Sequence, residues 1–247
     1  MLRSLGDLLM PRECAVCGRT LLAQERHLCL VCEAGLPLTH FEGLLHNPMA
    51  DAFNSQVEAQ AYEHAAALFY YRAGYRKITQ ALKYGRNFVL GRSVAGELGE
   101  RLAASGLWSG VGLVVPVPLH WTRRWRRGYN QAALIARELA RVLRRARIDR
   151  DSPSVRFEPR LLRRVRRTGT QTRLSNEERA ANVSGAFCVR KSIARRLRAQ
   201  AGQEANEVLI VDDVFTTGAT LAACHSALRA AFGPSVRISV ATLAFVD

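Results

Sequence analysis

The sequence predicts an α/β fold in which a parallel sheet is flanked by helices, with a small cysteine-rich unit before it. Short apolar runs, too short for helices, alternate along residues 57–247 with segments of helical periodicity. Four of the six cysteines form two Cys-x2-Cys pairs within residues 14–32. We therefore expect a four-cysteine finger over residues 1–45 and a larger α/β domain over residues 46–247.

The clustered cysteines have the spacing of a tetrahedral zinc site. Each pair can present two thiolates to one ion at about 2.3 Å, and Gly18 suits the first turn because glycine tolerates a positive φ. Disulfides and a redox dithiol are the alternatives, but a reducing cytosol disfavours the first and the second needs no duplicate pair. Four thiolates leave no open position, so the zinc is expected to be structural. The predicted ligands are Cys14, Cys17, Cys29 and Cys32. His27 is a weaker candidate, and Cys188 and Cys224 are expected in the core.

The elements of the larger domain follow from the spacing of apolar residues. Residues 35–55 contain Gly, Pro and Asn with little periodicity, and we interpret them as a linker. Short apolar runs predict strands, and apolar positions at 3.6-residue spacing predict helices. The predicted strands are residues 65–71, 113–118, 208–211 and 236–245, and the predicted helices are residues 76–84, 91–104, 131–148 and 220–231.

The charge of the chain is concentrated in one segment. The formal net charge is +15, and residues 121–198 carry 23 basic and 6 acidic side chains. A genome bias explains the choice of Arg over Lys but not the clustering, which favours a phosphate-bearing partner, either a nucleotide or a nucleic acid. No run approaches the roughly 18 apolar residues of a membrane span, and residues 1–10 lack the order of a secretory signal. We expect a cytoplasmic protein without membrane insertion.

The strongest chemical signal follows the apolar run at residues 208–211. Asp212 and Asp213 come next, and then a turn rich in Thr and Gly that opens a helix. Such a turn directs backbone N–H groups and hydroxyls at a phosphate, and Gly218 lets the backbone approach closely. The carboxylates could accept hydrogen bonds from a sugar diol or hold Mg²⁺ indirectly. A capped helix start is the simpler alternative, but it leaves two acids at the end of a buried strand unexplained.

This motif resembles the signature of type I phosphoribosyltransferases that binds 5-phosphoribosyl 1-pyrophosphate (PRPP). The resemblance implies the type I phosphoribosyltransferase fold, Mg²⁺ bound with PRPP, and Asp212 and Asp213 on the ribose hydroxyls. It implies a 5′-phosphate site at Thr216, Thr217, Gly218, Ala219 and Thr220. Purine-salvage members carry a carboxylate at the position of Thr216, so a 6-oxopurine substrate is not expected.

Residues 115–131, with Val-Pro-Val-Pro-Leu-His-Trp followed by Arg-Arg-Gly-Tyr-Asn-Gln, resemble the hallmark of the ComF (GntX-like) family of competence proteins. This family joins a zinc-ribbon-like four-cysteine finger to a phosphoribosyltransferase domain. Residues 82–86 and 162–187 also fit the family. By position, the loop after Pro118 corresponds to the pyrophosphate loop of the wider fold. The residues expected on pyrophosphate or on nucleic-acid phosphates are Lys83, Arg123, Arg124, Arg126 and Arg127.

Two basic segments keep alternative interpretations. Trp121, Trp125 and Tyr129 alternate with the arginines after Pro118, which suits base stacking beside a neutralised backbone. A solvated surface for the arginines and core packing for the rings remain open. The basic cluster at residues 160–167, followed by residues 168–171, fits either a mobile hood over the site or a flexible loop without that role.

Two main functions follow from these features. The first is a ComF-like protein that binds PRPP and handles single-stranded DNA during DNA uptake and natural transformation, with a competence helicase or the uptake machinery as a candidate partner. The second is a Mg²⁺-dependent phosphoribosyltransferase, a pentosyl glycosyltransferase, acting on an unidentified acceptor. A PRPP-sensing regulator is a third. The sequence supplies the PRPP half of such a site but reveals neither a base pocket nor a catalytic residue.

Overall fold

A five-stranded parallel sheet forms the centre of the computed structural model, which describes residues 12–119, 128–147, 154–165, 185–200 and 207–247. All four strand pairs in this sheet are parallel. A separate antiparallel hairpin joins β4 (Leu162–Arg164) to β5 (Phe187–Val189). In sheet order the strands are β1 (Ala65–Tyr70), β7 (Arg237–Phe245), β6 (Glu207–Phe215), β2 (Val111–Pro116) and β3 (Arg156–Phe157).

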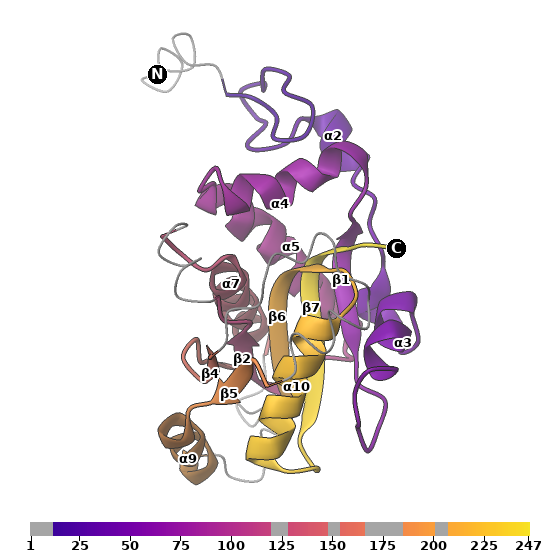
Figure 1. The fold of residues 1–247 in the computed structure, drawn as a ribbon. Coiled ribbons are helices and arrows are strands. Elements are labelled where there is room, and N and C mark those ends of the chain that lie inside the picture. Colours follow the sequence, from indigo (N-terminus) through magenta and orange to yellow (C-terminus); the bar gives the residue numbers. More distant parts are fainter. Residues whose placement is uncertain (1–11, 120–127, 148–153, 166–184, 201–206) are drawn as a thin grey trace.

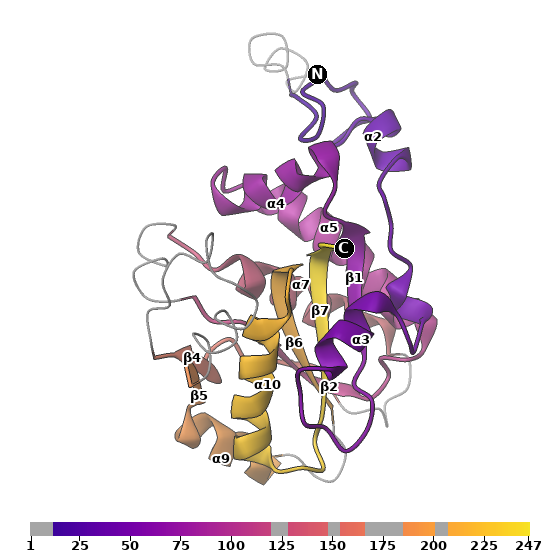
Figure 2. The ribbon, with the colours of Figure 1, turned by 45° about the vertical axis from the view of Figure 1, so that its right-hand side comes forward.

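Helices cover both faces of the sheet, so the predicted fold class is confirmed (Figures 1 and 2). α5 (Phe88–Ser105) and α7 (Gln131–Ala146) pack together on one face, and α10 (Ala219–Phe232) lies on the other. α9 (Lys191–Gln200) lies beside the C-terminal half of α10. Among the helices of the described ranges, none is long and apolar enough to cross a membrane.

The predicted linker at residues 35–55 is wrong, because this segment is folded against the sheet. It contains a 3-10 helix, η1 (Phe41–Gly43), and the helix α3 (Pro48–Asn54). The Phe41 ring packs edge-on against Phe245, and Phe53 is fully buried. Asn47 caps α3 by accepting a hydrogen bond from the Ala50 N–H, and proline follows at the first helical position. This start signal is present in the sequence but is isolated from any long periodic run. The division of the chain at residue 45 stays a prediction.

The strand expected over residues 208–211 is longer than the sequence predicts. β6 continues through Asp212 and Asp213 to Phe215, because Asp212, Val214 and Phe215 still pair with β7. The acidic pair therefore belongs to the strand and not to the turn after it. Consecutive residues of a strand leave it on opposite sides, but here both carboxylates stay close enough to Lys83 for their charges to raise its pKa.

The finger is docked on the helix that follows β1. Within the finger, α2 (Leu30–Ala34) begins directly after Cys29. The Tyr75 hydroxyl, from the 3-10 helix η2 (Ala73–Tyr75), donates to the Cys32 carbonyl at 3.1 Å. The Lys77 Nζ, from α4 (Arg76–Lys83), donates to the Val16 carbonyl at 2.9 Å. The finger therefore contacts the N-terminal end of α4, and the C-terminal end of α4 lies at the edge of the sheet.

Candidate functional site

The acidic pair lies at the carboxyl edge of the parallel sheet, where ligands bind in open α/β folds. Lys83, the last residue of α4, meets it there: its Nζ lies 3.0 Å from the Asp213 carboxylate. Burial lowers the pKa of Lys83, but the charges of Asp213 and Asp212 outweigh it and raise the pKa above its usual value. The lysine is therefore a permanent cation of the site.

The surroundings of Asp212 disfavour its ionised form. Its Oδ1 accepts a hydrogen bond from the Asp213 N–H at 2.8 Å. Burial, and then the neighbouring Asp213 charge, raise the pKa of Asp212 to about 7, although Lys83 and Arg164 act in the opposite direction. Among the described residues, Lys83 forms an ion pair with Asp213 and Arg164 adds a positive charge near Asp212, but together they do not offset the effects that raise this pKa. An acid destabilised in this way is typical of a site that awaits a ligand.

The turn after β6 is built around Gly218. This residue has a φ of +78° and stands at the N-cap of α10. A Cβ at Gly218 would lie 2.7 Å from the Phe215 ring and 2.9 Å from the Gln56 side chain, so only glycine fits without displacement. Gly218 offers no side chain to cap the first N–H groups of α10, and a small hollow lined by Asp212 and residues 214–221 lies at this end of the helix.

Two residues contribute to this edge that the sequence did not single out for the site. The Gln56 Nε2 donates to the Thr217 carbonyl at 2.6 Å and to the Ala52 carbonyl at 2.7 Å, tying the turn to the end of α3. Arg164, in the hairpin strand β4, lowers the pKa of Asp212 through its charge. Gln56 lies 161 residues from its partner, so no local pattern could have found it. Arg164 lies within the basic cluster at residues 160–167, but no feature of the sequence distinguishes it from the other arginines there.

Most of the arginine loop predicted after Pro118 lies outside the described residues. That part includes Trp121 and Trp125 and the four predicted phosphate contacts Arg123, Arg124, Arg126 and Arg127. Tyr129 is described, and its side chain is half-buried. Its ring meets Phe88 edge-on at 4.7 Å, and its hydroxyl donates to the Leu82 carbonyl. The ring is thus half-buried against Phe88 and lies outside the buried core.

The four cysteines of the finger converge as a metal-binding group. Their Sγ atoms all lie within 4.8 Å of one another. The Sγ atoms of Cys17 and Cys29 are 3.8 Å apart, which matches the edge of about 3.8 Å for a tetrahedron with Zn–S bonds of about 2.3 Å. All six cysteines are free thiols, so the disulfide alternative is not realised. The donors therefore fit a zinc ion.

Backbone N–H groups favour the thiolate at Cys14 and Cys29, whereas burial raises the pKa of Cys32. The Cys29 N–H donates to the Cys14 Sγ at 3.4 Å. Burial raises the pKa of Cys14, but N–H groups of Cys17, Cys29 and Val16 outweigh it and lower the value to about 6. The other two cysteines behave differently from each other: Cys224 is buried as predicted, whereas Cys188 is half-buried, contrary to the expectation that it lies in the core.

Comparison with curated proteins agrees with the sequence resemblance. Competence protein F of Haemophilus influenzae is 37% identical over 116 residues, which span 47% of this chain and 43% of that protein. DNA utilization protein YhgH of Salmonella typhimurium is 28% identical over 212 residues, 85% of this chain and 80% of the relative. The resemblance to the ComF family is confirmed. The YhgH protein of Escherichia coli is 27% identical over the same lengths, and no family model matches the chain.

Proposed function

We propose that this chain is a ComF-type protein that binds PRPP at the carboxyl edge of its sheet and handles single-stranded DNA during DNA uptake. The names of its relatives, competence protein F and DNA utilization protein, support a role in competence or DNA utilization. The PRPP part is carried by one observation. A buried parallel strand, β6, carries two adjacent acids near its carboxyl end, and α10, whose N-terminus has no side-chain cap, begins four residues after the strand ends.

PRPP would meet complementary groups along this edge. The 5′-phosphate would occupy the turn at residues 216–220, where N–H groups of α10 and the helix dipole attract an anion. The ribose hydroxyls would donate to the carboxylates of Asp212 and Asp213. Lys83 lies close enough to Asp213 to reach the pyrophosphate side of the same sugar. Ligand binding would then replace the mutual repulsion of the two acids with hydrogen bonds.

Mg²⁺ would enter this site together with its ligand. Asp213 is already paired with Lys83, and Asp212 has a pKa of about 7. The two carboxylates alone are therefore a poor ligand set for a hard divalent cation, which needs six oxygens. PRPP supplies pyrophosphate oxygens, which complete the coordination and balance the ion's charge. When bound, the ion would stabilise negative charge on departing pyrophosphate.

The finger is proposed to hold one structural zinc ion at Cys14, Cys17, Cys29 and Cys32. Its thiolates occupy all four tetrahedral positions, so the ion has no place for a substrate. Its contribution is to fold residues that have too small a core of their own. The folded finger in turn holds α4 through the hydrogen bonds of Tyr75 and Lys77.

A catalytic role in phosphoribosyl transfer is the second candidate, and the PRPP half of the site favours it. Transfer requires a site that stabilises departing pyrophosphate and shields the developing oxocarbenium ion. Thr216 stands where purine-salvage enzymes carry a carboxylate, so the acceptor would not be a 6-oxopurine. A PRPP-sensing regulator would need the same binding site and no acceptor.

Two binding measurements test the proposal. Calorimetric titration with PRPP, with and without Mg²⁺, measures PRPP binding, and fluorescence anisotropy of a labelled oligothymidylate measures DNA binding. Both ligands should bind, and PRPP binding should require Mg²⁺. PRPP-dependent release of pyrophosphate on addition of a base would favour the enzyme. A protein that binds the oligonucleotide but not PRPP would refute the proposed use of the acidic pair.

A further inference from the structure

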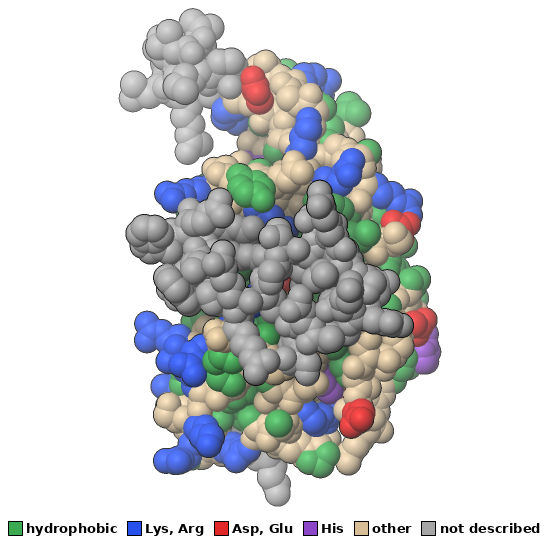
Figure 3. Space-filling model, in the orientation of Figure 1, with side chains coloured by type: hydrophobic (Ala, Val, Ile, Leu, Met, Phe, Trp, Pro, Cys, Tyr) green, Lys and Arg blue, Asp and Glu red, His purple; other side chains and the backbone are tan. Residues whose placement is uncertain are grey.

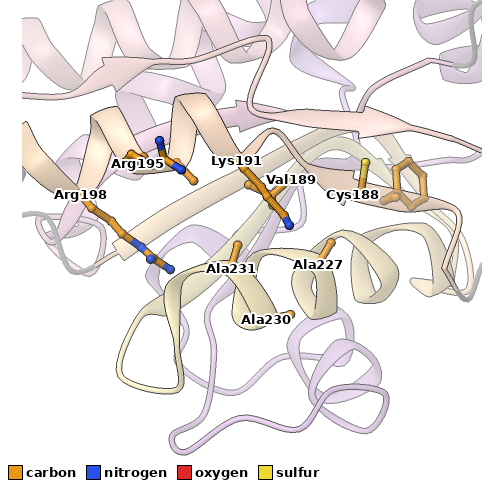
Figure 4. A pocket seen from close by; sticks show the side chains of 10 residues that line it. Cys188, Val189, Lys191, Arg195, Arg198, Ala227, Ala230 and Ala231 are labelled. Carbon is orange, nitrogen blue, oxygen red and sulfur yellow. The ribbon is translucent and has the colours of Figure 1, made fainter.

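A groove runs between α9 and the C-terminal half of α10, with β5 at one end (Figure 4). Its cavity volume is about 530 Å³. The α10 wall consists of small side chains, which keep the groove open along the helix. Its apolar lining includes Phe187, Val189, Ala194, Ala227, Ala230 and Ala231.

The α9 wall is cationic. Lys191, Arg195 and Arg198 line the groove, and their i, i+4, i+7 spacing places them on one side of the helix. At 1.5 Å of rise per residue they span about 10 Å. Among the described residues, no acidic side chain lines the groove and none forms an ion pair with these three cations. The neighbouring Arg196, on another side of α9, pairs instead with Glu158.

The positive surface continues beyond the groove. Arg163 in β4 and Arg190, directly after β5, are exposed and have no ion-pair partner in the described ranges. Figure 3 shows Lys and Arg side chains gathered over the part of the molecule where α9 and the hairpin lie, with no Asp or Glu among the described residues visible there. A row of cations that extends past one cavity fits a long polyanion better than a compact ligand or a short acidic helix.

We propose that this groove binds the phosphodiester backbone of single-stranded DNA, with Lys191, Arg195 and Arg198 each neutralising a phosphate. The DNA partner rests on the proposed function, whereas the location rests on the groove itself. An alanine wall offers no polar group to read base edges, so binding is independent of sequence. This site differs from the loop after Pro118, where the sequence predicts nucleic-acid contacts.

The position of the groove has a consequence for PRPP. Ala227 follows Gly218 by nine residues, which is about 13 Å along α10. The phosphate turn and the groove are therefore separate sites on one helix. DNA and PRPP bind at the same time in this arrangement, and saturating PRPP with Mg²⁺ leaves the affinity for an oligonucleotide unchanged.

The test uses the full chain and a labelled oligothymidylate, with the dissociation constant measured by anisotropy across a salt series. The triple variant Lys191→Gln, Arg195→Gln and Arg198→Gln should weaken binding about tenfold or more. It should also reduce the slope of log K against log salt by about 2, since each single-strand phosphate contact contributes roughly 0.7. The matched control neutralises three exposed arginines of α5 and α7 that form no ion pair among the described residues, Arg92→Gln, Arg137→Gln and Arg145→Gln.

A second pair of variants tests the groove without removing a contact. Ala230 is exposed on the α10 wall, so both substitutions should fold. Ala230→Glu should weaken oligonucleotide binding and Ala230→Lys should strengthen it, with PRPP affinity the same in both. A control triple that lowers the salt slope as much as the groove triple would overturn the proposal.

The remaining outcomes separate the inference from the proposed function. If the wild-type chain binds the oligonucleotide and the groove triple binds it equally well, the groove is not the DNA site, although the DNA role survives. If the wild-type chain binds no oligonucleotide at any salt concentration, both the groove inference and the proposed DNA role are refuted. Tight binding of polyglutamate that the groove triple abolishes, without binding of oligothymidylate, would assign the groove to an acidic protein segment and refute the inference.

Discussion

Replacing Asp212 with asparagine should stabilise the fold, and more so at high pH. The substitution keeps the shape of the side chain and an Oδ1 that accepts the Asp213 N–H, so it removes only the charge. The Lys83–Asp213 pair at 3.0 Å remains. An acid whose pKa is raised in the folded state costs stability as pH rises, because the unfolded chain releases the proton first.

The magnitude follows from the pKa of Asp212, which burial and the Asp213 charge raise from 3.8 to about 7. Each pH unit between these values costs about 1.4 kcal/mol, so the full penalty above pH 7 is at most about 4 kcal/mol. Relaxation around Lys83 reduces it, and we expect a gain on the order of 1–3 kcal/mol at pH 8. At pH 5 the Asp212 carboxyl is protonated in most folded molecules, so the gain in stability is smaller.

Urea unfolding of the wild type and of Asp212→Asn at pH 5 and pH 8 measures this difference in the free energy of unfolding. Asp247→Asn serves as the control, because its exposed carboxylate pairs with Arg72, which lowers its pKa. That variant should show no gain at either pH. An Asp212→Asn variant that is less stable than the wild type at pH 8, or equally stabilised at both pH values, would refute the electrostatic account of the acidic pair.

Three further predictions concern the finger, the turn and the basic loop. Protein prepared without chelator should contain one zinc per chain, and Cys14→Ser should reduce hydrogen-exchange protection mainly before residue 45; substoichiometric zinc in the wild type would contradict this. Gly218→Ala should lower stability by about 1–3 kcal/mol in urea unfolding, because the φ is +78° and the Phe215 ring is 2.7 Å from the new Cβ; a neutral result would mean the turn adapts. Neutralising the four arginines of the loop after Pro118 should abolish pyrophosphate binding if that loop is a pyrophosphate site. If the loop contacts DNA, the same change should flatten the slope of log K against log salt. No change in either quantity would leave codon usage as the explanation for these arginines. These four are Arg123, Arg124, Arg126 and Arg127.

The sequence predicted most of the sheet because its signals are local. The runs at residues 65–71 and 236–245 became β1 and β7 with almost the predicted limits. The extension of β6 past Val211 could not be seen, because Asp212 and Asp213 disfavour strands on their own. Their strand conformation comes from pairing with β7, which is a tertiary effect.

The candidate site was predictable where a contiguous motif carried it. The cysteine pairs and the motif ending at Thr220 each lie within a short segment. The contacts of Lys83 with Asp213, and of Gln56 with Thr217, join residues more than a hundred positions apart. The groove beside α10 was missed because alanines and arginines form no recognised motif, although the charge of residues 121–198 pointed to a phosphate partner.

The central claim is that PRPP binds at the acidic pair, and calorimetric titration tests it most directly. Mg²⁺ and PRPP are titrated into the wild type and into the double variant Asp212→Asn with Asp213→Asn. The pair Glu97→Gln with Glu100→Gln, which removes the same charge on α5 away from the site, is the control. The account predicts that the double variant folds and loses PRPP affinity by about 100-fold or more, while the control binds as the wild type does. Equal PRPP affinity in the double variant and the wild type would contradict it.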